Sequence, residues 1–344
     1  MKDIKSMCLS EIEEEFKELL LPKYRARQVY DWLSKGVKNF DEMTNISKSL
    51  REMLKSNYVI LGVEIEKKFE SNLDDTVKYL FRLHDNEFIE AVLMKYNHGY
   101  SMCISTQVGC KMGCKFCATG KSGFLRNLEP SEMLSQIQVA QHDNDIRISN
   151  IVLMGMGEPL DNYKNVLKFL MLVSDSNGMN IGMRHISLST CGLVDKMYDL
   201  ANEGFQLTLS VSLHAPNDEI RNQIMPVNRR WNVDELIKAC KDYIEKTNRR
   251  ISFEYAMINE LNDTQQCAEE LSRLLKGMLC HVNLIPINNV EGSIYEKSNE
   301  KRLRRFVDTL KRNRINVTVR RTLGADISAS CGQLRRNNVL TKEV

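Results

Sequence analysis

The sequence predicts an α/β protein in which a partial (β/α)6-type barrel is joined to a small N-terminal helical domain and a short antiparallel β extension. Three observations support this fold class. Residues 1–58 hold three short amphipathic patterns, residues 59–105 alternate with period two, and residues 106–344 alternate strand and helix patterns nearly to the end. Right-handed βα crossovers build a parallel sheet, and the site of such a fold lies at the carboxyl ends of its strands.

The N-terminal region predicts three short helices. Ser10 with Glu13 forms the S-x-x-E pattern of a capping box, which predicts a helix through about Leu20 that Pro22 ends. Two further helices are expected over residues 26–35 and 48–57. Three short helices bury little core alone, so we expect them to dock on the rest of the chain or on a large partner.

The period-two region predicts strands over residues 59–69, 76–83, 87–95 and 101–105. Within it, Glu90 shares one strand face with Phe88, Val92 and Met94. A carboxylate among apolar neighbours lies either at an exposed sheet edge or in a pocket that raises its pKa. In the second case Glu90 is a candidate general base.

The rest of the chain predicts six or seven βα units. We expect strands over residues 148–154, 184–190, 206–213, 251–258, 281–285 and 316–320. Helices are expected over residues 131–142, 163–175, 194–202, 233–247, 264–276 and 300–313.

A cysteine-rich loop precedes these units, with Cys110, Cys114 and Cys117 in a C-x3-C-x2-C spacing and Cys103 seven residues earlier. A structural zinc site takes four closed ligands, whereas three thiolates leave one iron of a [4Fe–4S] cluster open for a small molecule. Phe116 provides an apolar wall that keeps water from a redox centre. The loop therefore predicts an open [4Fe–4S] cluster and radical chemistry.

Polar residues follow several of the expected strands. Gly155 and Gly157 permit close backbone approach to a ligand, and Glu158 after them can accept hydrogen bonds from an amino group. Hydroxyl, imidazole and amide side chains at the next strand ends would complete a polar ring around a ribose and a carboxylate. These residues are Ser189, Ser212, His214 and Asn288.

Cys331 lies in a loop that contains Ser330 and Gly332 and is flanked by arginines. This setting favours a reactive, reachable thiol over a buried structural one. From the residues alone, Cys331 is a fourth cluster ligand, a nucleophile or a partner for Cys103. In contrast, Cys240, Cys267 and Cys280 lie in amphipathic or apolar runs and are expected to be small core residues.

Composition restricts the class of protein. The chain has 344 residues, a formal net charge of +3 and ten cysteines. It has no apolar run of membrane-spanning length and no apolar segment near the N-terminus, so we expect a cytoplasmic protein whose cysteines serve metal binding or catalysis. Basic clusters would suit a phosphate-backbone surface. They lie at Arg229–Arg230, Arg249–Arg250, Lys301–Arg305, Lys311–Arg314, Arg320–Arg321 and Arg335–Arg336.

Taken together, these motifs resemble the radical S-adenosylmethionine (SAM) enzymes, whose C-x3-C-x-aromatic-C signature matches the cysteine loop. Over nearly the whole chain, VGCKMGCKFCA, RNL, GMGEPLDN, SLHAPNDEIR, MPVN and RRTLGAD with SCGQLR resemble the RNA adenine-C2 methyltransferases. In that family one enzyme methylates an adenine in the peptidyl transferase centre of 23S rRNA and an adenine in the tRNA anticodon loop. The resemblance implies a radical SAM partial barrel at 106–344, with an RNA-engaging module at 1–58.

The resemblance also implies the cofactor-binding residues. The three loop cysteines, Cys110, Cys114 and Cys117, would hold a [4Fe–4S] cluster whose open iron binds SAM. The residues that match the SAM contacts of the family are Gly157, Glu158, Ser189, Ser212, Leu213, His214 and Asn288. An electron donor such as flavodoxin or ferredoxin would reduce the cluster of a monomeric enzyme.

The reactive residues implied by the resemblance are Cys331, Cys103 and Glu90. Cys331 would take a methyl group from a first SAM by displacement. A second SAM would give a 5′-deoxyadenosyl radical that removes hydrogen from this methyl, and the carbon radical would add to adenine C2. Cys103 would then attack the Cys331 sulfur, releasing the product and leaving a transient disulfide. Glu90 matches the proton acceptor of the family.

One segment departs from the C2 pattern. The C2 enzymes usually continue the last cluster cysteine with Ala-Ser-Thr, whereas this chain has Ala118-Thr119-Gly120, which is more like the related adenine-C8 methyltransferases of ribosomal antibiotic resistance. Pro159 and the Lys111-Met112 pair favour the C2 group. Two other hypotheses are a non-catalytic, zinc-stabilised RNA-binding protein with Cys103 or His98 as fourth ligand, and a radical SAM enzyme for a small molecule.

Overall fold

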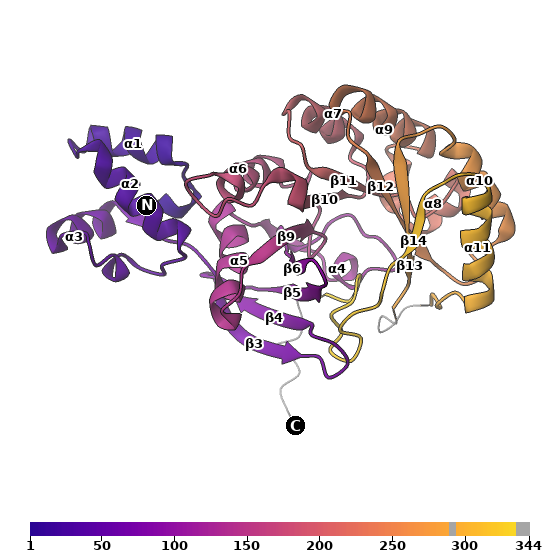
Figure 1. Ribbon diagram of the computed structural model, residues 1–344, viewed down its shortest axis with the longest axis horizontal. Coiled ribbons are helices and arrows are strands. Elements are labelled where there is room, and N and C mark those ends of the chain that lie inside the picture. The colour runs from indigo at the N-terminus through magenta and orange to yellow at the C-terminus, as the bar shows by residue number, and fades with distance from the viewer. Residues whose placement is uncertain (289–293, 335–344) are drawn as a thin grey trace.

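The computed structural model describes residues 1–288 and 294–334, and in that part of the chain one ten-stranded sheet carries the fold (Figure 1). Its order is β14-β13-β12-β11-β10-β9-β6-β5-β4-β3. The parallel strands are β6 (Gly99–Cys103), β9 (Ile148–Leu153), β10 (Ile186–Thr190), β11 (Thr208–Ser212), β12 (Ile251–Met257), β13 (Cys280–Pro286) and β14 (Val317–Val319). Each adds beside its predecessor in one direction, which keeps the crossover helices on one face and gives the predicted partial barrel.

The crossover helices agree with the predicted pattern, with ends that shift by at most two residues. They are α5 (Pro130–Asn144), α6 (Tyr163–Ser174), α7 (Val194–Asn202), α9 (Val233–Thr247), α10 (Gln265–Leu274) and α11 (Glu300–Arg312). One further helix, α8 (Asp218–Ile224), was not predicted; Asn217 caps it by accepting a hydrogen bond from the Ile220 amide at 3.0 Å. The cysteine loop adds α4 (Ala118–Lys121) and the short antiparallel pair β7 (Gln107–Gly109) and β8 (Phe124–Asn127).

The antiparallel extension belongs to the same sheet as the barrel. It consists of β3 (Glu64–Glu70), β4 (Val77–Arg82) and β5 (Phe88–Tyr96), and β5 pairs antiparallel with β6 while β6 pairs parallel with β9. Because β5 lies between β4 and β6, the predicted alternative that places Glu90 at an exposed edge is wrong. The predicted first strand also begins later than expected, at Glu64.

The N-terminal helices pack around a core of their own, which includes Ile12, Phe16, Val29 and Leu54. They are α1 (Leu9–Glu18), α2 (Lys23–Ser34) and α3 (Lys48–Asn57), with the small parallel pair β1 (Lys2–Asp3) and β2 (Tyr58–Val59). The capping box of α1 is not the predicted Ser10–Glu13 pair. Cys8 is the N-cap, and its amide donates to the Glu11 carboxylate at 2.6 Å.

Polar contacts dock this module on α5 and α6, and Figure 1 shows it as a lobe beside the barrel. The Ser131 amide donates to the Ser6 hydroxyl at 3.1 Å, and the Gln138 amide group donates to the Leu33 carbonyl at 2.9 Å. On α6 the docking is continued by Lys168, which is ion-paired with Glu11. The expectation that the helices dock on the rest of the chain is therefore confirmed, whereas the domain boundaries at 58 and 105 stay predictions. Among the described residues, no helix is long and apolar enough to cross a membrane.

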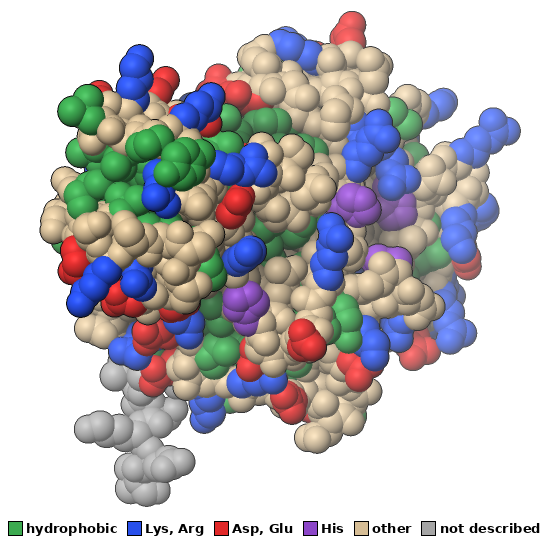
Figure 2. Space-filling view, turned by 60° about the vertical axis from the view of Figure 1, so that its left-hand side comes forward, with side chains coloured by type: hydrophobic (Ala, Val, Ile, Leu, Met, Phe, Trp, Pro, Cys, Tyr) green, Lys and Arg blue, Asp and Glu red, His purple; other side chains and the backbone are tan. Residues whose placement is uncertain are grey.

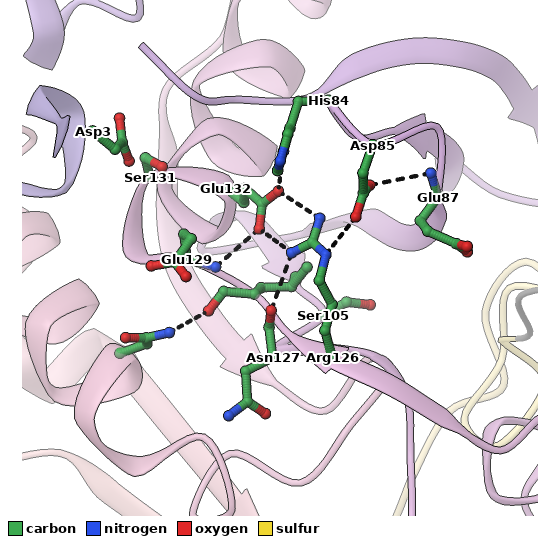
Figure 3. A network of polar contacts seen from close by, with 12 residues as sticks. Asp3, His84, Asp85, Glu87, Ser105, Arg126, Asn127, Glu129, Ser131 and Glu132 are labelled. Atoms are coloured by element: carbon green, nitrogen blue, oxygen red, sulfur yellow. Dashed lines mark hydrogen bonds and ion pairs between the residues drawn. The ribbon is translucent and has the colours of Figure 1, made fainter. Parts of the chain in front are cut away.

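A buried carboxylate organises the start of α5 (Figure 3). Glu132 is fully buried and accepts both terminal nitrogens of the Arg126 guanidinium, at 2.8 and 2.9 Å. It also contacts the His84 ring at 3.2 Å and accepts the Glu129 amide at 2.9 Å. Arg126 in turn donates to Asp85 at 2.6 Å. The network fixes β8 and the β4–β5 turn to the helix that carries the N-terminal module.

We expect Glu132→Ala to lower the free energy of unfolding by about 3 kcal/mol, because it leaves a partly buried guanidinium without its bidentate partner. The matched control is Glu300→Ala. Glu300 pairs with Arg304 through side chains that are 85% and 79% exposed, so the change should be below about 0.5 kcal/mol. Urea unfolding followed by circular dichroism compares the two variants. Equal small changes in both would contradict the structural role of Glu132.

Candidate active site

Two adjoining cavities lie at the carboxyl ends of the parallel strands. The larger, here called the cysteine-loop cavity, has a volume of about 160 Å³ and is lined by Cys110, Cys114 and Cys117. The smaller, the thiol-pair cavity, has a volume of about 60 Å³ and is lined by Cys103 and Cys331. Both are also lined by Cys117, Cys331, Arg320 and Gly155, so they share a wall.

Backbone hydrogen bonds hold the cysteine loop in place. The Cys110 amide donates to the Gly123 carbonyl at 2.8 Å, and the Lys115 amide donates to the Ile224 carbonyl of α8 at 2.9 Å. Phe116 lines the cavity, and its ring meets the His214 ring edge-on, 4.8 Å between centroids. The aromatic residue of the signature therefore forms the apolar wall that the sequence predicts.

The chemistry of this loop fits a cationic metal centre. Burial raises the pKa of the Cys110 thiol to about 12. The pKa of the Cys114 thiol is raised further, first by burial and then by the neighbouring Cys117 and Cys110. Three thiolates in such a place need positive charge beside them, which iron supplies. Among the described residues, no three His, Cys, Asp or Glu side chains are grouped closely enough to ligate a single metal ion. The two residues that the zinc hypothesis offered as a fourth ligand lie elsewhere. Cys103 lines the thiol-pair cavity, and His98 is exposed beside Tyr96.

Glu158 is the most constrained polar residue of the cysteine-loop cavity. Its carboxylate accepts the Cys191 amide at 2.7 Å and the Leu160 amide at 3.1 Å, and its burial raises its pKa. Gly157 before it has a φ of +104°, and a Cβ there would lie 2.6 Å from the Gln107 Cβ. The glycine is therefore needed where the turn packs against the chain's own backbone, in addition to any approach of a ligand.

Ser189, Ser212 and His214 line the same cavity from the ends of β10 and β11, as the sequence predicts. Two other residues that were matched to SAM contacts do not line this cavity. Leu213 is fully buried and does not line the cavity, and Asn288 lines the thiol-pair cavity, where it donates to the Cys331 carbonyl at 3.2 Å.

His214 is neutral and its tautomer is fixed. Burial, with a contribution from the Arg221 guanidinium, lowers the pKa of His214 to about 3. The Nδ1 atom accepts the Ala256 amide at 2.9 Å, so the proton is on Nε2. The imidazole can therefore donate one hydrogen bond from Nε2.

The loop around Cys331 is held against the cysteine loop. The Ala118 amide donates to the Gly332 carbonyl at 2.8 Å, and the Thr119 hydroxyl donates to the Leu334 carbonyl at 2.6 Å. Cys331 is partly exposed, whereas Cys103 is buried, and no disulfide joins them. Burial, together with the nearby Cys331, raises the pKa of Cys103 to about 12, an effect that the Arg320 guanidinium opposes.

Glu90 does not line the thiol-pair cavity. It is fully buried and pairs with Lys78, with 3.2 Å between its Oε1 and the lysine Nζ. Val92, two residues along the same strand face, does line the thiol-pair cavity. The predicted base is therefore one side chain away from the cavity wall.

Several residues of the site were missed or misread from the sequence. Arg320 was grouped with the surface bases but lines both cavities, and Arg335–Arg336 lie outside the described residues. Glu254 of β12 lines the cysteine-loop cavity and accepts the Asn283 amide group at 2.8 Å. The fully buried Arg221 donates to the carbonyls of Cys191, Ser212 and Leu213. Period two gave no signal for two of these side chains, because Glu254 shares its strand face with Ser252 and Ala256, and Lys78 shares its face with Thr76, Leu80 and Arg82.

Comparison with known proteins identifies the family. Residues 104–271 match the radical SAM superfamily, and residues 2–60 match the ribosomal RNA large subunit methyltransferase N-terminal domain. The probable dual-specificity RNA methyltransferase RlmN of Alkaliphilus oremlandii (strain OhILAs) is 54% identical, with 98% of each chain covered. The protein of the same name from Clostridium novyi (strain NT) is 50% identical, with 98% of this chain and 99% of the relative covered. The chain belongs to the RlmN family of radical SAM methyltransferases.

A solved structure agrees with this assignment. The crystal structure of a radical SAM methyltransferase from Sphaerobacter thermophilus superimposes with a TM-score of 0.93 at 41% sequence identity, and covers 98% of this chain and all of that chain. Membership of the RlmN family makes the chain an enzyme whose cofactors are a [4Fe–4S] cluster and SAM. The donor set of the cysteine loop fits the cluster, and the polar strand ends form a cavity beside it.

We expect His214 to stay neutral from pH 8 to pH 5, since its folded pKa lies far below the value near 6.5 of an unfolded histidine. Only the unfolded chain then takes up this proton, so His214 costs stability as the pH falls below 6.5. Heteronuclear NMR of histidine-labelled protein prepared without iron tests this, with His214→Asn assigning the resonance. A titration midpoint between pH 6 and 7 would contradict it.

Proposed function

We propose that this enzyme methylates C2 of adenine in 23S rRNA and in the tRNA anticodon loop through a methylated Cys331. One observation carries the proposal: Cys103 and Cys331, far apart in sequence, line one small cavity that adjoins the cavity of the three loop cysteines. The names of the relatives, which describe dual-specificity RNA methyltransferases over nearly the full length of this chain, support RNA as the substrate.

The cofactor-binding residues follow from the cysteine-loop cavity. Cys110, Cys114 and Cys117 would hold the cluster, and Glu158 would accept hydrogen bonds from the amino group of SAM. Ser189, Ser212 and the Nε2–H of His214 lie at neighbouring strand ends, where they would bind its polar groups. When bound, the two cofactors supply a carbon radical that can activate a methyl group. Phe116 and the buried strand ends exclude water from that chemistry.

The two reactive thiols would act in sequence. The Cys331 thiolate attacks the methyl carbon of SAM, so that a sulfur–carbon bond forms and S-adenosylhomocysteine leaves. Once the carbon is joined to adenine C2, the Cys103 thiolate attacks the Cys331 sulfur. A disulfide forms, the sulfur–carbon bond breaks, and the carbon takes up a proton to become the product methyl. Arg320, which lines both cavities, would favour the thiolate form of Cys103.

Adenine C2 is itself electron-poor, which explains why the chain needs this sequence of thiols. Polar attack by that carbon on a methylsulfonium fails, whereas addition of a carbon radical to the ring does not. Glu90 would accept the proton that C2 loses, and a one-electron acceptor, the oxidised iron–sulfur centre, would take the unpaired electron, so that the ring becomes aromatic again. An electron donor of the flavodoxin or ferredoxin class would reduce the cluster.

The RNA surface includes the N-terminal module and the basic side chains of the C-terminal half. Figure 2 shows that Lys and Arg side chains on the face seen there are interspersed with Asp and Glu rather than gathered in one band. Recognition would then depend on several separate phosphate contacts, and binding should weaken as salt rises.

Mass spectrometry of nucleosides from treated RNA tests the regiochemistry, since it separates 2-methyladenosine from 8-methyladenosine. We expect 2-methyladenosine from both 23S rRNA and tRNA. The adenine-C8 alternative, favoured by Ala118-Thr119-Gly120, would give 8-methyladenosine. An anaerobically purified protein should be brown, absorbing near about 400 nm, and a colourless zinc protein would overturn the proposal.

We expect Cys103→Ala to accumulate a covalent enzyme–RNA adduct through Cys331, because no thiol remains to break the sulfur–carbon bond. Cys331→Ala should form no adduct and no methylated RNA. Denaturing gel electrophoresis of enzyme with labelled RNA measures both. The control is Cys267→Ala, a buried core cysteine of α10, which should turn over normally. Free, fully active enzyme from Cys103→Ala would count against the mechanism.

A further inference from the structure

The hairpin between β3 and β4 holds the segment that leads to Cys331. The Gly324 amide donates to the Asp74 carboxylate at 3.0 Å. Asp326 accepts the Ser71 hydroxyl at 2.7 Å and the Asn72 amide at 2.8 Å. Figure 1 shows the same arrangement, with the yellow segment after β14 returning to the β3–β5 end of the sheet. The loop around Cys331 is therefore attached to the antiparallel extension as well as to the cysteine loop.

Lys78 extends this attachment into the interior. Its Nζ lies 3.2 Å from the Glu90 Oε1 and 3.5 Å from the Ser328 carbonyl, and 4.9 Å from the centre of the Phe69 ring. The lysine side chain is 3% exposed and the glutamate 0%. One buried ammonium thus contacts both the predicted base and the backbone three residues before Cys331.

The strand register explains how this happens. On β4 and β5, Lys78 pairs with Val92 and Leu80 pairs with Glu90, so Lys78 and Glu90 are diagonal neighbours on one face. Val92 lines the thiol-pair cavity. Lys78 is therefore the cross-strand neighbour of a residue in the wall of the cavity that Cys103 and Cys331 line.

We infer that Lys78 is a positioning residue for the proposed reaction: it holds the Glu90 carboxylate in place and fixes the Cys331 loop above it. The inference rests on the proposed function, because only there does Glu90 accept a proton. In that step the C2–H bond breaks, the proton goes to a Glu90 oxygen, and the electron pair of the bond returns to the ring. The unpaired electron left by the radical addition would pass to a one-electron acceptor, the oxidised iron–sulfur centre. Lys78 balances the charge of the waiting carboxylate, which is costly to bury alone.

The test separates methylation of Cys331 from resolution of the RNA adduct. In Lys78→Met, mass spectrometry of the enzyme should show Cys331 methylation within about twofold of the unchanged enzyme, because Glu90 takes no part in that step. Resolution of the adduct should slow at least tenfold, so the adduct should accumulate with RNA. Lys78→Arg keeps the charge and should restore most of the resolution rate. Lys95→Met is the control, since Lys95 lies on β5 and is 49% exposed.

Glu90→Gln provides a second arm. If Lys78 acts through Glu90, the double variant Lys78→Met with Glu90→Gln should resolve the adduct no more slowly than the slower single variant. Replacing both partners also removes the buried unpaired charge, so this variant keeps the test usable if Lys78→Met folds poorly; circular dichroism checks folding. Fully additive losses, or normal resolution in Lys78→Met, would overturn the inference.

Failure of the proposed function would look different. In that case the unchanged enzyme would carry no methyl group on Cys331, or Cys103→Ala would form no adduct. If the unchanged enzyme carries the methyl group and Cys103→Ala forms the adduct, but Lys78→Met resolves its adduct normally, only the role of Lys78 is wrong.

Discussion

Desolvation of the cysteine loop is the constraint on which the rest of this site depends. Water is excluded by Phe116, by His214 and by the strand ends around them, and in that environment three thiols resist ionisation. A metal centre reverses the balance by adding positive charge. The same burial keeps His214 neutral and raises the pKa of Glu158, so the cavity offers hydrogen bonds with little competing charge.

Buried and partly buried cations compensate this apolar setting from outside the cysteine loop. Arg221 donates to three strand-end carbonyls, so it fixes the ends of β10 and β11 that carry the polar groups of the cavity. Arg320 lines both cavities. Lys78 lies next to Val92, which lines the thiol-pair cavity. Each cation serves a different wall, which lets one small space hold a metal-binding loop and a thiol pair side by side.

The sequence predicted most elements because the period-two and period-3.6 patterns are strong in this chain. It also singled out Cys103 and Cys331, although their proximity depends on the path of the C-terminal segment, which no local pattern encodes. Lys78 was missed because a lone lysine in a strand is usually exposed; here the packing of the hairpin against residues 324–328 buries it. Arg221 was missed because its partners are backbone carbonyls, which a sequence does not display.

The capping error at α1 arose because Cys8 and Ser10 both stand three residues before a glutamate, and only the 3₁₀ turn at Ile4–Ser6 decides where the helix begins.

The segment that departs from the family pattern, Ala118-Thr119-Gly120, lies where the cysteine loop contacts the loop around Cys331. Thr119 donates its hydroxyl to the Leu334 carbonyl, and a serine at this position, as in the Ala-Ser-Thr pattern, carries the same donor. The difference is therefore concentrated at Gly120, where a Cβ would lie 2.9 Å from the Cys114 carbonyl oxygen. A larger residue there would require the loop to shift by a few tenths of an ångström around Cys114. The departure thus changes how the cysteine loop packs more than how the Cys331 loop is held, so the hydrogen bonds that hold the Cys331 loop do not depend on it.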